Sequence, residues 1–579
     1  MKTNSKRFWS YAKSQKMVKS LPVTMKYNDI ELSSLPSIVS NFNIFFKSMF
    51  STASFVLPSL NVHDVPPFYI NQVSTIQMKA AIKRLDPNTS SGFGDIPVKL
   101  LTNCADVLCV PLTFIFNMCI LNGEYPDALK MSNIVPVFKG KGNKICIEGY
   151  RGISILPIID KLFESLIKDQ LQPHLKRLIV DEQHGFQPKK SCFTNLACYS
   201  EFISSALDDK HEVHAIYTDF QRAFDVVPHN LLLYKMKCLF GFQANALQFF
   251  ESYLTNRLQR VVIQGVASEW VEVTSGVPQG SILGPWLFSI YVNDIPKEMQ
   301  SSKSLLFADD GKFFRIITCI VDCLLLQHDI DQLCKWCDTW GISLNVSKCY
   351  FIPFTLKRMN KIDFIYTING SVVEQVDVIR DLGVYFTSKF CFKYHVEQIC
   401  KKANRMLGFV RRVVKPFYDE KVLICLYRTH VRSSLEYCTS IFSPHQEYLR
   451  NKIESIQRRA VKWICFKSRT PYSSSNYIYL CEKFGLPPLS ARREVTDLRN
   501  FNKLLTNNLN CSELVENVFY HVPTRQLRRN RLFVSSSRLE LRKHSFFPRV
   551  QRTCDEYDFL DIFENNSLTF KRAAEAIFY

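Results

Sequence analysis

The chain has 579 residues, of which 46% are hydrophobic and 22% charged, a composition typical of a globular protein with several domains. It carries 73 Lys and Arg against 53 Asp and Glu, a formal net charge of +20 at pH 7. Such an excess costs self-repulsion, and its usual benefit is attraction to a polyanion; simple solubility is the alternative. The start "MKTNSKRFW" lacks the apolar segment of a secretory signal. The longest apolar run, 107–121, is shorter than a membrane span and contains Pro111, so we expect an intracellular protein without a membrane segment.

The chain contains 20 cysteines. Without a secretory signal, most are expected to be reduced core residues, and disulfides are the alternative. Cys334 and Cys337 form one C-x-x-C pair, but no second pair follows at zinc spacing. We therefore expect no metal role for this pair.

The first third of the chain is mainly helical by pattern. Residues 1–75 contain short helical segments, and 76–130 is helical apart from a Gly-, Ser- and Pro-rich loop at 88–97. Residues 132–143 predict a strand that leads into a loop rich in Gly and Lys. An amphipathic helix is then expected over 156–175.

The middle of the chain alternates strands and helices. Residues 213–220 predict a buried strand that ends at Asp219, and 260–276 a hairpin. A mostly helical stretch, 279–295, precedes a second hairpin over 304–315, with Asp309, Asp310 and Gly311 in its turn. Residues 330–348 then predict a helix followed by a strand. Because no strict βαβ repeat is present, the fold class is α+β.

Beyond residue 390 the segments become basic and amphipathic. Residues 395–412 predict a helix whose apolar face carries Val396, Ile399, Ala403, Leu407 and Val410. Residues 453–464 repeat this pattern, and 525–552 hold nine Lys and Arg against one acid, Glu540. Each basic face alone is commonly a solvated surface, but the three together favour contact with nucleic acid.

Two adjacent carboxylates, Asp309 and Asp310, repel each other and raise each other's pKa in an apolar setting. A lone Asp pair is usually a solvated turn. Asp219, however, ends an apolar strand, where an unpaired carboxylate is costly. If that strand lies beside the 304–315 hairpin, three carboxylates converge and require cations. Mg²⁺, bound by carboxylates and substrate phosphates, fits this need, and two ions about 3.5–4 Å apart serve phosphoryl transfer.

The residues around these acids resemble a known family. "YTDFQRAFDVVPH" (217–229), "SGVPQGSILGPWLFSIYVNDI" (275–295) and "FADD" (307–310) resemble, in order and spacing, motifs A, B and C of reverse transcriptases of non-LTR (LINE-type) retrotransposons. "EQHGFQPKKSCFTNL" (182–196), "WGISLNVSK" and "IRDLGVYF" are similar to further motifs of that family. The segments "SSLEYCTSIFSP" and "FGLPPLSARR" resemble the tail of jockey-like elements.

The resemblance implies an α+β right-hand polymerase with fingers, a palm with an antiparallel ferredoxin-like sheet, and a thumb, followed by a mainly α-helical basic C-terminal region. The expected division is a linker at 1–75, fingers and palm at 76–390, a helical thumb at 391–470 and the basic region at 471–579. The chain would start after the point where such elements encode an endonuclease, which favours a truncated copy or a partial gene model.

The resemblance also assigns residues to a site. Asp219 and Asp309, with Asp310, would be the metal ligands, and Lys348 a general acid for the leaving pyrophosphate. The nucleotide would be bound by Lys139, Arg151, Phe220, Phe224, Gln279 and Gly280, and the primer gripped by Leu382 and Gly383. Phe224 would crowd the sugar 2′ position, and an ordinary core Phe is the alternative. For Lys139 a solvated loop is the alternative, because Lys141 or Lys144 could serve instead.

The implied function is that of an RNA-directed DNA polymerase, a nucleotidyltransferase that uses two Mg²⁺ ions, with Mn²⁺ as a substitute. Its partners would be an RNA template, a DNA primer or target and deoxynucleoside triphosphates, in the nucleus or the cytoplasm. One rival is a catalytically idle nucleic-acid-binding remnant, favoured by departures such as Gly152, where the family usually has Pro. An RNA-dependent RNA polymerase is a second rival, which Phe224 argues against.

Overall fold

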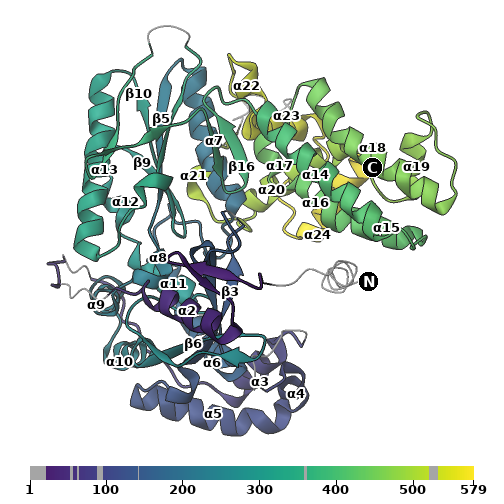
Figure 1. Ribbon diagram of the computed structural model, residues 1–579. Helices are drawn as coiled ribbons and strands as arrows, with labels where there is room; N and C mark the ends of the chain where they lie inside the picture. Colours follow the sequence, from purple (N-terminus) through teal and green to yellow (C-terminus); the bar gives the residue numbers. More distant parts are fainter. Residues whose placement is uncertain are drawn as a thin grey trace.

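The computed structural model describes residues 21–51, 56–60, 64–87, 96–140, 142–357, 361–520 and 532–579. Most of the predicted 88–97 loop, Lys141 and the start of the basic stretch at 525–531 lie outside these residues. Two five-stranded sheets occupy different parts of the molecule, and a group of helices lies to one side of them (Figure 1).

The first sheet contains the predicted strand and the predicted second hairpin. Its order is β14-β11-β5-β10-β9. The strands are β5 (Glu212–Asp219), β9 (Lys303–Phe307), β10 (Asp310–Ile317), β11 (Tyr350–Phe354) and β14 (Glu374–Gln375). All neighbours pair antiparallel except the two-residue β14, which is parallel to β11.

Two expectations in this region were wrong in detail. Asp310 and Gly311 belong to β10, so the hairpin turn consists of Ala308 and Asp309 alone. No strand forms between Gly341 and Lys348; a 3₁₀ turn, η3 (Val346–Lys348), precedes β11. The reason is that the chain leaves α13 (Ile320–Trp340) through Gly341, at φ +66°, and bonds to the end of β5 through Asn345.

Helices cover both faces of the first sheet. Successive strand residues point to opposite faces, so Ile216 and Phe313 pack toward α13 while Ala215 and Phe314 pack toward α7 (Cys192–Asp208). Each side has its own hydrophobic core. The strand β5 is therefore buried on both faces, as its apolar run predicts.

The second sheet has the order β4-β3-β6-β7, with β8 also paired to β6. Its strands are β3 (Met131–Phe138), β4 (Tyr150–Ile155), β6 (Arg257–Ile263), β7 (Val266–Ala267) and β8 (Val271–Val273). The antiparallel return from β6 to β7 and β8 is the predicted 260–276 hairpin. One face of this sheet packs on α2 (Leu35–Lys47) through Phe42 and Phe46.

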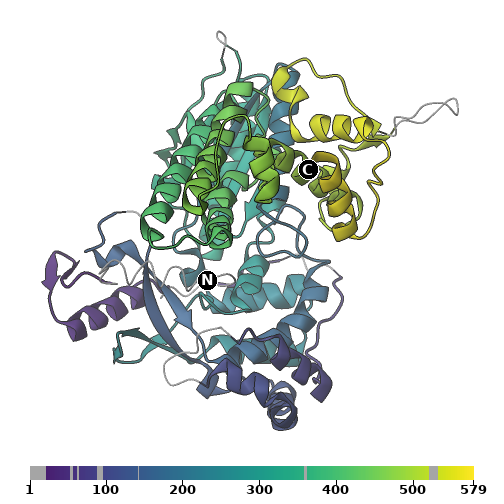
Figure 2. The same cartoon turned by 90° about the vertical axis from the view of Figure 1, so that its right-hand side faces the viewer.

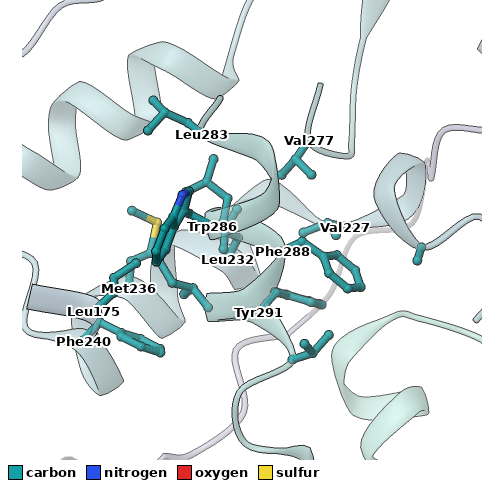
Figure 3. Packing of buried hydrophobic residues seen from close by; sticks show 14 of the residues in the cluster. Leu175, Val227, Leu232, Met236, Phe240, Val277, Leu283, Trp286, Phe288 and Tyr291 are labelled. Carbon is teal, nitrogen blue, oxygen red and sulfur yellow. The ribbon is translucent and has the colours of Figure 1, made fainter. Parts of the chain in front are cut away.

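Helices between the sheets form the largest core. Figure 3 shows α9 (His229–Phe240) and α11 (Gly284–Tyr291) packing through Leu232, Met236, Trp286 and Phe288. The same core takes in α3 (Thr75–Arg84), α4 (Val98–Asn103), α5 (Ala105–Asn122), α6 (Ile158–Leu175) and α10 (Ala244–Leu254). The smaller elements of this half are β1 (Met25–Tyr27), β2 (Ile30–Leu32), η1 (Asp127–Leu129), η2 (Ile147–Gly149), α8 (Ala223–Val226) and α12 (Ile295–Glu298).

The helix α5 is longer than the apolar run suggested. With 18 residues and a mean hydropathy of 1.7, it could cross a membrane by length and composition, and 28% of it is buried. It packs inside the protein through one face: Phe116 stacks on Phe163 of α6, with ring centroids 4.1 Å apart. Phe114, on the opposite face, is 69% exposed.

A basic helical bundle follows the sheets. It comprises α14 (Lys393–Val413), α15 (Glu420–Leu426), the π-helix η4 (Tyr427–Arg432), α16 (Ser433–Glu436), α18 (Glu447–Ser468) and α19 (Tyr477–Lys483). The five predicted apolar residues of α14 are all buried, and its exposed cations are Lys393, Lys401, Lys402, Arg405, Arg411 and Arg412. The bundle core also includes Leu486 and Leu489, beyond the boundary expected at 470.

The C-terminal helices pack on the α7 side of the first sheet (Figures 1 and 2). They are α17 (Thr439–Phe442), α20 (Leu489–Leu505), α21 (Ser512–Val515), α22 (Glu540–Lys543), α23 (Phe546–Glu556) and α24 (Ser567–Phe578), with a short hairpin β17 (Phe519–Tyr520) and β18 (Leu532–Phe533). Part of the predicted basic stretch is engaged internally, because Arg542 pairs with Glu201 at 2.5 Å and Arg549 with Asp497 at 2.8 Å.

The two phenylalanines of α5 offer a matched test of this packing. Phe116→Ala should lower the free energy of unfolding by about 3–5 kcal/mol, because it leaves a cavity against Phe163. Phe114→Ala should change it by less than about 0.5 kcal/mol. Urea unfolding of both variants measures this, and equal effects would contradict the packing described for α5.

Candidate active site

The pairing of β5 with β10 brings two of the predicted acids together. Asp219, the last residue of β5, lies directly opposite Asp310, the first residue of β10. Directly opposed residues on antiparallel strands share one face, with Cβ atoms about 4.5–5.5 Å apart. Asp309 precedes Asp310 in the turn, so the structure gathers all three carboxylates at one end of the sheet, as the sequence predicts.

The negative charges of the three carboxylates repel one another. Burial, followed by the charges of Asp309, Asp381 and Asp219, raises the pKa of Asp310 to about 7. Burial and the charge of Asp219 also raise the pKa of Asp309, against the opposing effect of Lys348 and Arg151. Such a group is more stable when positive charge lies beside it.

Lys348 supplies one such charge. Its Nζ lies 2.5 Å from Oδ2 of Asp219, and its side chain is 60% exposed. The backbone N–H of Asn345 donates to the carbonyl of Asp219 at 2.8 Å, which holds the η3 turn against the end of β5. The ammonium group of Lys348 therefore partly neutralises the carboxylate of Asp219.

The donor chemistry of the three acids suits a hard cation, because carboxylate oxygens are the ligands that Mg²⁺ prefers. Their oxygen atoms do not form a trio within 4.8 Å of one another; among the described residues, only His184, Cys198 and Cys511 do so. The ion pair with Lys348 holds one oxygen of Asp219.

A segment that sequence reasoning left without a role holds the turn. Oε1 of the fully buried Gln183 accepts hydrogen bonds from the N–H of Ala308, at 3.0 Å, and from that of Gly185, at 2.8 Å. Ala308 has φ +59°, a conformation that costs energy for a residue with a side chain. A Cβ on Gly185 would lie 2.2 Å from the nitrogen of Ala308. The resemblance of "EQHGFQPKKSCFTNL" to a family motif was the available signal, but it gave Gln183 no role.

The predicted primer-grip residues lie in another hairpin, formed by β15 (Val378–Asp381) and β16 (Val384–Thr387). Leu382 and Gly383 form its two-residue turn, at φ +42° and +91°. A buried ion pair links this hairpin to the acids: Nζ of Lys312, on β10, lies 2.5 Å from Oδ2 of Asp381. Removal of Asp381 would leave a buried ammonium unpaired.

Cations of the second sheet face the carboxylates. Desolvation and the nearby charges of Lys348, Arg151 and Arg222 lower the pKa of Lys139. The charge of Arg151 also opposes the rise in the pKa of Asp309, so Arg151 lies within electrostatic reach of both Asp309 and Lys139. Nζ of Lys139 donates to the carbonyl of Glu148 at 3.0 Å. Among the described residues, Lys139 and Arg151 thus contribute positive charge near the negative charge of the three aspartates.

Phe224, Gln279 and Gly152 line one small cavity of about 50 Å³. Phe224 stacks on Phe288 with centroids 4.7 Å apart and is half-buried. Gly280 has φ +129°, and a Cβ there would lie 2.6 Å from the carbonyl oxygen of Ser154, so only glycine fits. Phe220, by contrast, is 4% exposed and packs toward Trp336 in the core.

The cysteines follow the expected core pattern. All 20 lie in the described part of the chain with free thiols, and 11 are buried. Cys334 and Cys337 are buried in the α13 core, where desolvation raises the pKa of both thiols.

Comparison with known proteins extends these observations. Residues 139–386 match the family model "Reverse transcriptase (RNA-dependent DNA polymerase)". This range includes the strands β5, β9 and β10 and all three acids. Residues 139–386 are a reverse transcriptase domain.

Named relatives are of the non-LTR retrotransposon kind, which confirms the resemblance. The chain is 28% identical to the "RNA-directed DNA polymerase from mobile element jockey" of Drosophila funebris, over 68% of this chain and 44% of that protein. It is 27% identical to the "Probable RNA-directed DNA polymerase from transposon BS" of Drosophila melanogaster, over 68% of this chain and 45% of that protein. The "Probable RNA-directed DNA polymerase from transposon X-element" of Drosophila melanogaster is 30% identical over 50% of this chain and 32% of that protein. The chain thus spans less than half the length of these relatives.

The glycine beside the turn can be tested. Gly185→Ala should destabilise the reverse transcriptase domain by about 2 kcal/mol or more, because its Cβ collides with backbone that cannot move without losing the Gln183 bonds. Gly408→Ala, in α14, meets only the end of Arg412 at 3.6 Å and should be neutral or stabilising. Thermal unfolding of both variants measures this; a neutral Gly185→Ala would contradict the close approach.

Proposed function

We propose that this protein is an RNA-directed DNA polymerase that adds deoxynucleotides to the 3′-hydroxyl of a primer on an RNA template. The observation that carries the proposal is the convergence of Asp219, Asp309 and Asp310 within a reverse transcriptase domain, opposite Lys139 and Arg151. The printed names of the relatives support it. Charge of both signs on facing elements suits a reaction in which phosphates approach carboxylates.

Asp219 and Asp309, with Asp310 beside them, would hold two Mg²⁺ ions, for which Mn²⁺ can substitute. Divalent metal ions, when bound, supply the positive charge that an attacking hydroxyl and a leaving pyrophosphate need. The raised pKa values of Asp309 and Asp310 support this role, since these carboxylates gain most from a neighbouring cation.

The chain's own residues would then orient the substrates. Lys139 and Arg151 would bind the triphosphate, Lys as a point charge and Arg as a fork. Lys348, close to Asp219, would give a proton to the leaving pyrophosphate. Gln279 and Gly280 would lie against the incoming nucleotide, since Gln279 lines the cavity next to Phe224 and Gly280 follows it in the chain. For Phe220, its burial favours a supporting role in the core over contact with nucleotide.

The fold suggests a polymerase hand. The first sheet would be the palm, the second sheet with its helices the fingers, and the bundle from α14 the thumb. The exposed cations of α14 would follow the phosphates of the template–primer duplex, so binding should weaken steeply with salt. Leu382 and Gly383, at the tip of the β15–β16 hairpin, would contact the primer. An intracellular location, in the nucleus or the cytoplasm, follows from this role.

Primer extension on poly(rA)/oligo(dT) with purified full-length protein tests the activity. Wild type should synthesise DNA only with Mg²⁺ or Mn²⁺, and Asp309→Asn should reduce the rate by about two orders of magnitude or more. Asp338→Asn, an exposed carboxylate on α13, is the matched control and should be unaffected. Synthesis that survives Asp309→Asn would refute the assignment, and a wild type that binds the duplex without extending it would favour the idle remnant.

The Phe224 side chain tests sugar selection. Phe224→Ala should lower the preference for deoxynucleotides over ribonucleotides by at least about tenfold in kcat/KM, because it removes the bulk next to the proposed sugar position. Deoxynucleotide incorporation by the same variant serves as its folding control. An unchanged preference in an active variant would show that Phe224 is only a core residue packed on Phe288.

A further inference from the structure

Three side chains with metal-binding atoms meet on the α7 side of the first sheet. One ligand atom each of His184, Cys198 and Cys511 lies within 4.8 Å of the other two, and all three residues are buried. The two sulfurs are 3.3 Å apart, although 313 positions separate the cysteines in the sequence. This cluster is formed by tertiary structure alone.

The imidazole is held in place by bonds that have no catalytic use. The backbone N–H of His184 donates to the carbonyl of Leu306 at 2.9 Å. The ring Nδ1 forms a hydrogen bond with the hydroxyl of Thr194 at 2.8 Å. With Nδ1 engaged by Thr194, the ring has its second nitrogen, Nε2, to offer to a metal ion.

The two thiols are coupled to each other and to a carboxylate. One thiol donates a hydrogen bond to the other, with the sulfurs 3.3 Å apart. The carboxylate of Glu513 also acts on Cys198, and it lies 2.8 Å from Nζ of Lys303. Glu513 is partly exposed and lies two residues from Cys511.

An open path leads to the cluster. A cavity of about 320 Å³ is lined by His184, Cys511 and Glu513, and its other acids are Asp181, Glu182 and Glu516. A metal site needs such an entrance as well as its ligands. Lys190 and Lys303 also line the cavity and pair with Asp181 and Glu513. Glu182 and Glu516 therefore leave an excess of negative charge that favours the arrival of a cation.

We propose that His184, Cys198 and Cys511 bind a structural Zn²⁺ ion, with Glu513 as the fourth ligand. Two thiolates, an imidazole and a carboxylate make a tetrahedral set that suits Zn²⁺, whereas the aspartate site offers only hard oxygen donors. On binding, the two thiols release their protons to solvent and Glu513 leaves Lys303. No electrons are exchanged.

The ion would fasten the C-terminal region to the polymerase core. Cys511 lies between α20 and α21, Cys198 on α7, and His184 next to Gln183, which holds the turn with Asp309. The site would thus stabilise the segment under the catalytic turn and the packing of the C-terminal helices at once. It does not depend on the proposed polymerase activity.

The test uses the full-length chain purified in reductant. Zinc measured by mass spectrometry should be about one ion per chain, and Co²⁺ in its place should give thiolate charge-transfer bands and intense tetrahedral bands. Cys198→Ala and Cys511→Ala should lose the zinc and the charge-transfer bands. Cys465→Ala, a buried cysteine of the α18 bundle, is the matched control and should retain both.

Wild-type protein provides a second measurement that needs no variant to fold. A chelator should increase the alkylation rates of Cys198 and Cys511 at least about tenfold and leave that of Cys465 unchanged. A wild type without zinc and without cobalt bands would overturn the proposal. So would metal that persists in the Cys198→Ala/Cys511→Ala double variant.

Discussion

The antiparallel pairing of β5 with β10 is the interaction on which the site depends. It sets Asp219 opposite Asp310 and places Asp309 in a two-residue turn beside them, so that three like charges meet at the edge of an apolar sheet. Their mutual repulsion opposes the pairing that creates it. The surroundings offset this cost with Lys348 at Asp219 and with cations from the second sheet. Electrostatic attraction therefore acts between the acids of the first sheet and the cations of the second.

Segments distant in sequence hold the charged edge in shape. Gln183 ties the N–H of the strained Ala308, and the buried pair of Lys312 and Asp381 joins β10 to the β15–β16 hairpin. A buried pair of this kind adds little net stability but is costly to break, so it specifies one arrangement of the hairpin relative to the acids. The geometry of the site is thus a property of the whole reverse transcriptase domain.

The C-terminal region belongs to the same folding unit as the first sheet. Its helices α20, α23 and α24 share one hydrophobic core with α7 and the strands of the sheet. Arg542 and Arg549 add ion pairs across this contact, which explains why part of a basic stretch serves packing and not solvation. The exposed cations of α14, in contrast, leave a basic surface on the neighbouring bundle.

The sequence by itself determined that β5 ends at Asp219 and which face of α14 is apolar, because these depend on local periodicity and on short motifs. It also identified the acids, since motif spacing along the chain carries that information. Only the tertiary structure decided that Asp310 lies in a strand and not in the turn, that Phe220 is core, and that Gln183 and Gly185 hold the turn. It alone united His184, Cys198 and Cys511. Such contacts join residues up to hundreds of positions apart, and no local pattern records which distant segments pack together.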